Sequence, residues 1–418
     1  MKIKRFIAFF IGLSLLPAFA SAEEMITATE VSIAEVQTDD RFHLFKALGI
    51  VTNYEDENDF FYIPYVSRGE YCSIMVRLIN DEVPADASVP FIDISENSDK
   101  DAIAYLYNSG VVSGVSEEEF CPELAITVEH AAIIASRMLG YDFFVNNYPE
   151  TSYIDVAQKY KLLKNISGDI KEAITKTQLL TLLENVINAE PFGMNISGEG
   201  PLYGINENGT ILEMSRKIYK TKGVMTENIY TNELGIKTNE RCTIVVDDIE
   251  YLDDDYQDKT DFLGKYVELY YKEEDGERTA LYIIPNERKT NEVIIPSEMI
   301  REPIDIDVLK YVSEGKLKEA KLSRALKVIY NGVAYTDYSL PELKPKYGEL
   351  RLVDSDDDRV FDYAFVTSYQ LMWLERYSAL DKKFYSKLSG GATEVYVNDT
   401  QPERNLYIEA DGKKSDRF

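Results

Sequence analysis

The sequence predicts an α + β multidomain protein, in which a helical bundle of three repeats precedes β-rich modules built as small barrels or sandwiches. A Ser or Thr that opens an apolar helix recurs three times in the first half, at spacings of about 50 to 60 residues. Beyond Pro191 the apolar residues change from helical to alternating periodicity. We therefore expect three repeats at 40–190, a linker at 191–209, and β-rich modules at 210–290 and 291–418.

The first 22 residues have the three parts of a secretory signal peptide. Basic residues within 2–5 precede an apolar run from Phe6 to Leu16, and Ala20-Ser21-Ala22 provides a small-residue cleavage site. An N-terminal membrane anchor is the weaker alternative, because this run is shorter than the roughly 20 residues that span a bilayer. We expect signal peptide 1–22 to be removed and the mature chain to be exported, with no membrane partner after cleavage.

The three helix starts are predicted at Ser67, Thr127 and Thr175, whose side chains can cap the first turn. Ser67 with Glu70, and Thr175 with Gln178, have the spacing of a capping box. In the middle repeat an earlier helix carries Ile103 and Leu106 on one side and ends near Gly110. The first and third repeats follow the same course with less regular turns.

The segment from Phe192 to Gly209 is rich in glycine, asparagine and serine, and its composition is typical of a linker. Short runs of alternating apolar residues follow, separated by turns such as Glu274-Asp275-Gly276. Residues 296–322 mix helical and strand signals. The expected strands lie at 222–226, 242–246, 266–271, 280–284, 325–330, 349–353, 363–367, 394–397 and 406–409.

Composition limits the possible partners. The formal net charge of -28 argues against nucleic acid or an anionic membrane as a general partner. An anionic ligand would therefore need a local group of cations. The three cysteines, Cys72, Cys121 and Cys242, lack the spacing of a zinc site and are interpreted as small buried hydrophobic residues, although Cys72 and Cys121 could pair.

Several short motifs occur in the repeats. An aromatic-x-Asp-apolar start occurs at Phe91 to Ile94 and again at Tyr153 to Val156. A Gly-apolar-apolar-x-Gly turn runs from Gly110 to Gly114, and a Phe-x-Pro step follows at Phe120 to Pro122. With the capped helix starts, these motifs make 40–190 resemble three consecutive S-layer homology domains, most closely in the middle repeat.

The resemblance implies a three-pronged helical bundle that attaches an exported protein to an anionic polysaccharide of a Gram-positive cell wall or S-layer. In the family the arginine at the helix start contacts the polymer, and the matching positions here are Arg68, Val128 and Lys176. Arg68 and Lys176, with the capping residues Ser67 and Thr175, are therefore the expected polymer-binding residues. The alternative is that these sequences only start helices.

The β-rich region carries no motif that assigns an activity, so we expect a structural or ligand-presenting role and no enzyme. The alternative is a wall-anchored hydrolase with its active site in the C-terminal region, because carboxylate pairs depend on the fold rather than on spacing. A pocket holding carboxylates with raised pKa values would favour that alternative. A third possibility is an anchor that no longer binds the wall and serves in protein assembly.

One acidic run is a candidate calcium site. Asp354, Asp356, Asp358 and Asp362 have the spacing of the early ligands of a calcium loop. Arg359 stands where such loops usually carry a glycine, and Phe365 stands at the closing acidic position. A solvated acidic turn between two strands is therefore the competing interpretation.

Overall fold

The computed structural model describes residues 39–80, 88–197, 200–205, 209–228, 243–254, 259–286 and 288–369, together with the five strands β15 to β19 near the C-terminus. The signal peptide expected at 1–22 and Cys242 lie outside the described residues. Cys72 and Cys121 are free thiols, the first buried and the second half-buried.

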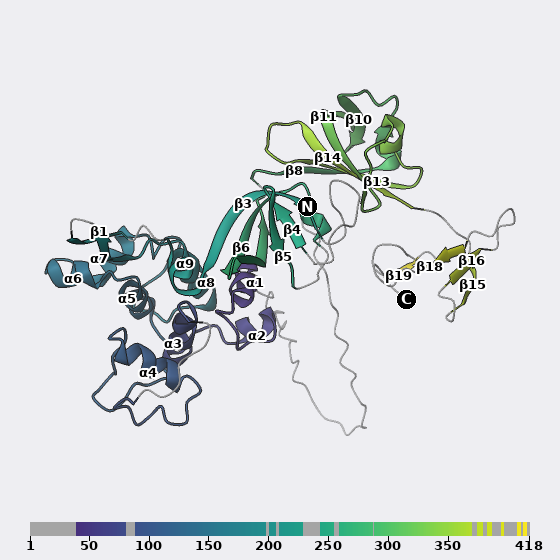
Figure 1. Cartoon of the computed structure of the whole chain (residues 1–418). Coiled ribbons are helices and arrows are strands. Elements are labelled where there is room, and N and C mark those ends of the chain that lie inside the picture. The colour runs from purple at the N-terminus through teal and green to yellow at the C-terminus, as the bar shows by residue number, and fades with distance from the viewer. Residues whose placement is uncertain are drawn as a thin grey trace, which may run out of the picture. The chain divides into compact units, whose positions relative to one another are not determined.

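The first region is helical (Figure 1). Ser67, Thr127 and Thr175 each cap a helix with an extended backbone and a side-chain oxygen that accepts a main-chain amide, as the sequence predicts. The helices are α1 (Asp40–Ala47), α2 (Glu57–Tyr62), α3 (Arg68–Arg77), α4 (Lys100–Asn108), α5 (Val128–Met138), α6 (Asp142–Asn147), α7 (Tyr153–Lys159), α8 (Lys176–Ile187) and α9 (Ile211–Arg216).

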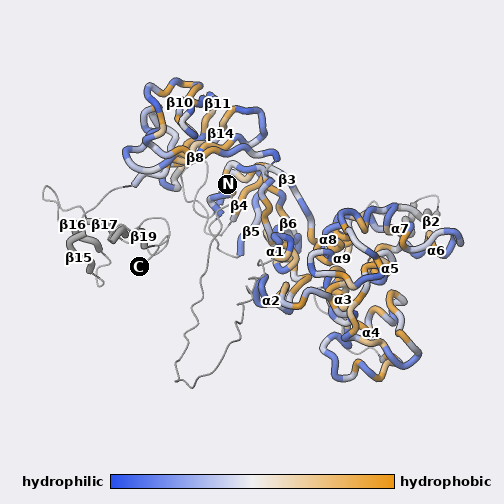
Figure 2. The backbone as a smooth tube through the Cα atoms, turned by 180° about the vertical axis from the view of Figure 1, so that it is seen from behind, coloured by the Kyte–Doolittle hydropathy of each residue, from blue (hydrophilic) through white to orange (hydrophobic). Residues whose placement is uncertain are grey.

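The repeats are joined head to tail. The second helix of each repeat contacts the first helix of the next, so that α3 lies against α4, α5 against α7, and α8 against α1. Arg41 of α1 confirms the last pair, since its Nη1 donates to Thr181 Oγ1 of α8 over 2.8 Å. The three repeats therefore close a ring around one shared apolar core. Figure 2 shows the hydrophobic stretches of this helical region in orange.

The turn after the first helix of each repeat needs a left-handed residue. Gly49 and Gly110 provide it at φ 68° and 73°, whereas Lys161 occupies the equivalent place in the third repeat at φ 63°. Glycine adopts this conformation without a Cβ penalty, and lysine does not. The third repeat thus keeps the backbone of the turn without the residue that would reveal it in the sequence.

The segment 191–209, expected to be a linker, contains an antiparallel hairpin of β1 (Phe192–Ser197) and β2 (Gly200–Ile205). The main-chain amide of Phe192 donates to Leu139 O over 2.8 Å, which attaches the start of β1 to the end of α5. The glycine-rich composition, typical of loops, does not reveal these two strands, which are held by main-chain pairing. The assignment of 191–209 as a linker between domains stays a prediction.

The next region is a closed barrel with the strand order β3-β4-β5-β7-β6. Neighbouring strands are antiparallel except β5 and β7, which pair in parallel at Leu252 and Thr279. This is a five-stranded Greek-key barrel, the architecture of OB-folds, which by itself assigns no function. Its elements are β3 (Ile218–Glu227), β4 (Thr243–Val246), β5 (Ile249–Leu252), η1 (Thr260–Phe262), β6 (Tyr266–Glu274) and β7 (Glu277–Pro285).

A second sheet follows, with the order β8-β13-β14-β11-β10-β9 and β12 paired to β11. The long strand β11 breaks register with β14 between Leu322 and Lys327, and such a break lets a sheet curve into a half-barrel. Its elements are β8 (Asn291–Pro296), η2 (Ser297–Met299), β9 (Ile300–Arg301), β10 (Val308–Ser313), β11 (Lys316–Tyr330), β12 (Val333–Ala334), η3 (Leu340–Leu343), β13 (Gly348–Asp354) and β14 (Phe361–Ser368).

Five short strands are described beyond residue 369: β15 (Leu374–Ser378), β16 (Lys383–Ser386), β17 (Glu394–Tyr396), β18 (Ile408–Ala410) and β19 (Lys413–Ser415). The predicted fold class, a helical three-repeat region followed by β-rich modules, is confirmed.

Candidate functional site

The three capped helix starts meet at the centre of the ring. The segment before each start pairs with the segments before the other two, through single antiparallel bridges. The structure therefore brings all the residues expected to bind polymer to the junctions between repeats. The bridges join Ser67 to Ala125, Thr127 to Ala173, and Tyr65 to Thr175.

The first and third main-chain amides of each of these helix starts are already occupied. The first helical amide of each donates to a carbonyl of the next repeat, and the third is held by the side chain of the cap. At α3 and α5 the second amide is bonded as well, from Gly69 to Pro122 O and from Glu129 to Ile170 O, so a ligand contact there must use side chains rather than the free amides that a helix start usually offers to an anion. The three bonds run from Arg68 N to Leu124 O at 2.9 Å, from Val128 N to Glu172 O at 3.1 Å, and from Lys176 N to Pro64 O at 2.8 Å.

Arg68 lies at the junction of the first and second repeats. Its guanidinium stacks on the ring of Phe120 with Cζ 4.5 Å from the ring centroid. Nε donates to Phe120 O and Nη2 to Ser113 O, both over 3.1 Å. Burial lowers the pKa of Arg68, yet an arginine remains cationic at neutral pH. Within the described part of the chain Arg68 forms no ion pair.

Asp93 fixes the loop on which Arg68 rests. Its carboxylate accepts the amide of Phe120 over 3.0 Å and that of Cys121 over 2.7 Å. Burial acts to raise the pKa of Asp93, but these two bonds and the charge of Arg68 outweigh it and hold that pKa below its ordinary value. The sequence marks Asp93 as part of a motif, and its positioning role becomes visible only in the structure.

Lys176 occupies the equivalent helix position at the junction of the third and first repeats, and it is 1% exposed. Its ammonium donates to Glu70 Oε1 and to the Tyr54 hydroxyl, which also donates to Glu70. It lies 4.4 Å from the ring centroid of Tyr54 and 4.7 Å from that of Phe60. Burial lowers the pKa of Lys176, and Glu70 opposes this shift. The cation thus faces partners within the protein.

Both cations sit on an aromatic ring that occupies the same place in each repeat. Phe60 and Phe120 precede the caps Ser67 and Thr127 by seven residues, and the residue seven before Thr175 is Gly168. At the junction of the second and third repeats, Val128 takes the helix position of Arg68 and Lys176, and Gly168 takes the position of the ring. Val128 is apolar and 2% exposed. The junction of the second and third repeats therefore lacks the cation and the ring together.

Ser67 and Thr175 act as helix caps. Ser67 Oγ accepts the amide of Glu70 over 3.1 Å, and Thr175 Oγ1 accepts that of Gln178 over 3.2 Å. The capping box predicted at Thr175 is complete, because Gln178 Oε1 accepts the Thr175 amide over 2.9 Å. The box predicted at Ser67 is half formed, since the Glu70 carboxylate turns to Lys176 and Tyr54 instead. Polymer binding by either hydroxyl stays a prediction.

The two aromatic-x-Asp motifs are not equivalent in the structure. The first precedes α4, where Asp93 holds the Phe120 loop, whereas the second lies on α7 itself. There Asp155 forms a capping box with Ser152. The match between these motifs in the sequence is therefore misleading for the third repeat.

The acidic run forms the turn between β13 and β14. Asp354, Asp356 and Asp362 each place a carboxylate oxygen within 4.8 Å of the other two. Asp358, the fourth expected ligand, is not in this group, and its Oδ1 accepts the amide of Val360 over 2.7 Å. Burial raises the pKa of Asp354. The structure thus brings together three of the four expected ligands.

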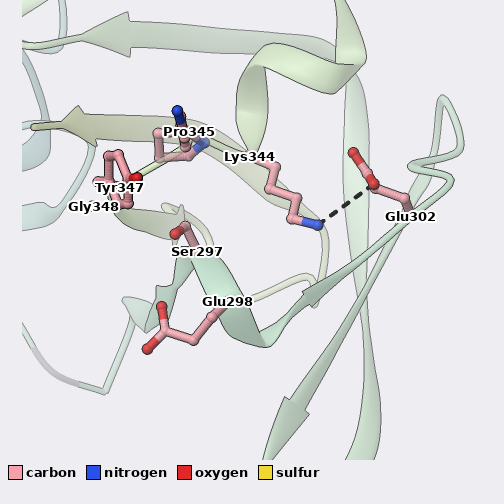
Figure 3. Close-up of a pocket in the computed structure, with 8 residues that line it drawn as sticks. Ser297, Glu298, Glu302, Lys344, Pro345, Tyr347 and Gly348 are labelled. Carbon is pink, nitrogen blue, oxygen red and sulfur yellow. Dashed lines mark ion pairs between the residues drawn. The ribbon is translucent and has the colours of Figure 1, made fainter. Parts of the chain in front are cut away.

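A pocket of about 560 Å³ opens beside η2 and the start of β13 (Figure 3). Glu298, Glu302 and Tyr347 contribute to its lining, and Lys344 Nζ pairs with Glu302 at 3.5 Å. Among the described carboxyl groups the one with a raised pKa is Asp354, which does not line this pocket. The feature that would favour a hydrolase is thus not found here.

No protein-family model matches the chain, and no curated protein matches its sequence. Across the described residues, every helix is too short or too polar to cross a bilayer. The resemblance to S-layer homology domains therefore rests on the sequence motifs alone.

Proposed function

We propose that the three-repeat region attaches an exported protein to an anionic polysaccharide of a Gram-positive cell wall, with Arg68 as its main contact. The observation that carries this proposal is a half-buried guanidinium at a repeat junction that has no ion pair in the described part of the chain. The resemblance of 40–190 to wall-binding domains supplies the class of ligand, and the stacked Arg68 supplies the chemistry.

The geometry of Arg68 suits a carboxylate or phosphate group on a polymer. Phe120 fixes the plane of the guanidinium, and the two carbonyls use Nε and one hydrogen of Nη2. The other donors of the planar fork are then available to bind an anion with two parallel bonds. A fixed fork loses little side-chain entropy on binding, which favours selective recognition.

The negative charge around Arg68 repels an anion that approaches from a distance. Glu117, Glu118 and Glu119 are exposed on the loop that joins Ser113 to Phe120. Attraction over a Debye length is therefore weak, and the polymer would be held by short-range bonds to Arg68. Replacing the three glutamates by glutamines should strengthen binding, most clearly at low salt.

The decisive experiment compares binding of the full chain, Arg68→Ala and Arg77→Ala to purified cell walls with and without their secondary polymers. Loss of charged hydrogen bonds should weaken binding by Arg68→Ala by about tenfold to a hundredfold. Arg77→Ala is the matched control, because it removes the same charge from the other end of α3. Equal binding by Arg68→Ala and the parent, or equal binding to stripped walls, would reject the proposal.

Cys121 offers a local readout. It is half-buried, adjoins Phe120 and interacts electrostatically with Arg68. Bound polymer should slow the reaction of Cys121 with a thiol reagent in the native protein, measured in a Cys242→Ser background. An unchanged rate at saturating polymer would place the contact elsewhere on the chain.

A further inference from the structure

The turn between β13 and β14, two inner strands of the second sheet, concentrates negative charge at one end of these strands. Both strands contribute core residues, including Leu352 and Val366. The turn joins them directly, so its conformation fixes how the two strands enter the core. Two of its residues, Asp357 and Arg359, adopt left-handed backbones at φ 62° and 70°.

Three carboxylates crowd this turn without a compensating cation. One oxygen from each of Asp354, Asp356 and Asp362 lies within 4.8 Å of the others, and none of the three forms an ion pair with a described residue. Like charges at this distance repel strongly where water is scarce. Asp354 is 0% exposed, so water cannot fully screen its carboxylate.

Asp354 also leaves one buried oxygen unsatisfied. Its Oδ2 accepts the amide of Arg359 over 2.9 Å, whereas Oδ1 has no hydrogen-bond partner. Asp362 is held by Ser355, whose hydroxyl donates to Oδ2 over 2.7 Å. Buried polar atoms in folded proteins almost always have a partner, so the orphaned Oδ1 indicates a ligand.

We propose that this turn binds one divalent cation, Ca²⁺, through Asp354, Asp356 and Asp362. An all-oxygen ligand set selects a hard cation, and Ca²⁺ lies about 2.3–2.6 Å from each ligand. Oxygens within 4.8 Å of one another can share such an ion, since ligands on opposite sides are about 5 Å apart. Ca²⁺ tolerates irregular coordination better than Mg²⁺, which suits an irregular turn. Water and main-chain oxygens complete the shell, and Asp358 is not a ligand.

The test is calorimetric titration of the full, chelator-treated chain with CaCl₂ and, separately, with MgCl₂. The parent should bind one Ca²⁺ more tightly than Mg²⁺, and Ca²⁺ should raise the melting temperature of the sheet, because an ion that binds only the folded state stabilises it. Asp356→Asn, at an exposed position, should weaken Ca²⁺ binding by about tenfold or more, as should Asp354→Asn.

Asp357→Asn is the matched control, since it removes one charge from the same turn and asparagine accepts a left-handed backbone. It should bind Ca²⁺ as the parent does, and so should Asp358→Asn. If all four variants lose affinity equally, the ion is attracted by the acidic surface alone and the site is rejected. Absence of binding at millimolar Ca²⁺, or tighter binding of Mg²⁺, also overturns the assignment.

Discussion

Two junctions of the ring place a cation at the same helix position and give it opposite environments. Arg68 stacks on Phe120 and binds two carbonyls, but it has no ion pair among the described residues. Lys176 stacks on Phe60, is almost fully buried, and donates to Glu70. An ammonium can be removed from water at this depth only because a carboxylate accompanies it. The same helix position therefore holds a buried ion pair at one junction and, at the other, a cation without an ion pair among the described residues.

The largest expected change in stability comes from removing Glu70, the carboxylate paired with Lys176. We expect Glu70→Ala to lower the free energy of unfolding by about 3–5 kcal/mol, because it leaves the Lys176 ammonium buried and unpaired. Arg68→Met should cost only about 1 kcal/mol. Urea unfolding of the full chain, followed by circular dichroism at 222 nm, measures both.

The control for this pair removes both charges. Glu70→Leu combined with Lys176→Met should recover most of the loss, since apolar side chains of similar volume often replace a buried ion pair without penalty. A loss below about 1 kcal/mol in Glu70→Ala would mean that Lys176 is not held as the structure shows.

A smaller difference should separate the two aromatic rings. Phe60 and Phe120 are both fully buried, so replacing either by leucine removes a similar apolar volume. The pair with the desolvated Lys176 is worth about 2 kcal/mol, against about 0.5–1 kcal/mol for the more exposed Arg68. Phe60→Leu should therefore destabilise the protein by about 1 kcal/mol more than Phe120→Leu. Equal losses in urea would show that the cations contribute nothing through the rings.

The smallest effect concerns alkaline pH. Burial raises the pKa of the Cys72 thiol, one turn beyond Arg68, to about 12 from an ordinary value of 9.0, with Arg68 acting in the opposite direction. Above pH 9 the unfolded chain releases this proton while the folded chain keeps it, so the stability present below pH 9 is lost progressively toward pH 12. At pH 10 the loss should be about 1 kcal/mol.

Cys72→Ala isolates this contribution. The stability of the parent relative to this variant should be constant below pH 9 and fall above it, under reducing conditions. Lys176 changes the stability in the opposite direction. Burial lowers its pKa, so the folded chain releases this proton at a lower pH than the unfolded chain does, and the contribution of Lys176 to stability increases as pH rises. A flat difference between parent and variant up to pH 11 would contradict the burial of the thiol.

The sequence predicts those features that depend on residues close together in the chain. The capped starts at Ser67, Thr127 and Thr175 are visible because a side chain binds an amide three residues away. The turn at Asp275 and Gly276 can be predicted because both residues have positive φ values, and Asp-Gly is a preferred pair for such a hairpin turn. The acidic turn near Asp354 brings three of its carboxylates together for the same reason, since they lie within one short loop.

What the sequence misses depends on distant partners. The burial of Lys176 depends on Glu70, 106 residues earlier, and no local pattern reveals that partner. The strand β5 escapes prediction because its four residues follow an Asp247-Asp248 turn with positive φ values, which asparagine or glycine would signal more clearly. Barrel closure by β5 and β7 is likewise a property of the whole fold.

The contact between α8 and α1 also sets the order in which the helical region can be built. Arg41 and Thr181, which meet across this contact, are 140 residues apart in the chain. Until α8 has been synthesised, the apolar face of α1, with Phe42 and Phe45, lacks its contact with α8 and is covered only in part, since Phe42 packs against Phe60 of α2. Closing so long a loop is entropically costly, and contacts of this range slow folding. A nascent or truncated chain that ends before residue 176 should therefore need a chaperone to keep α1 from aggregating.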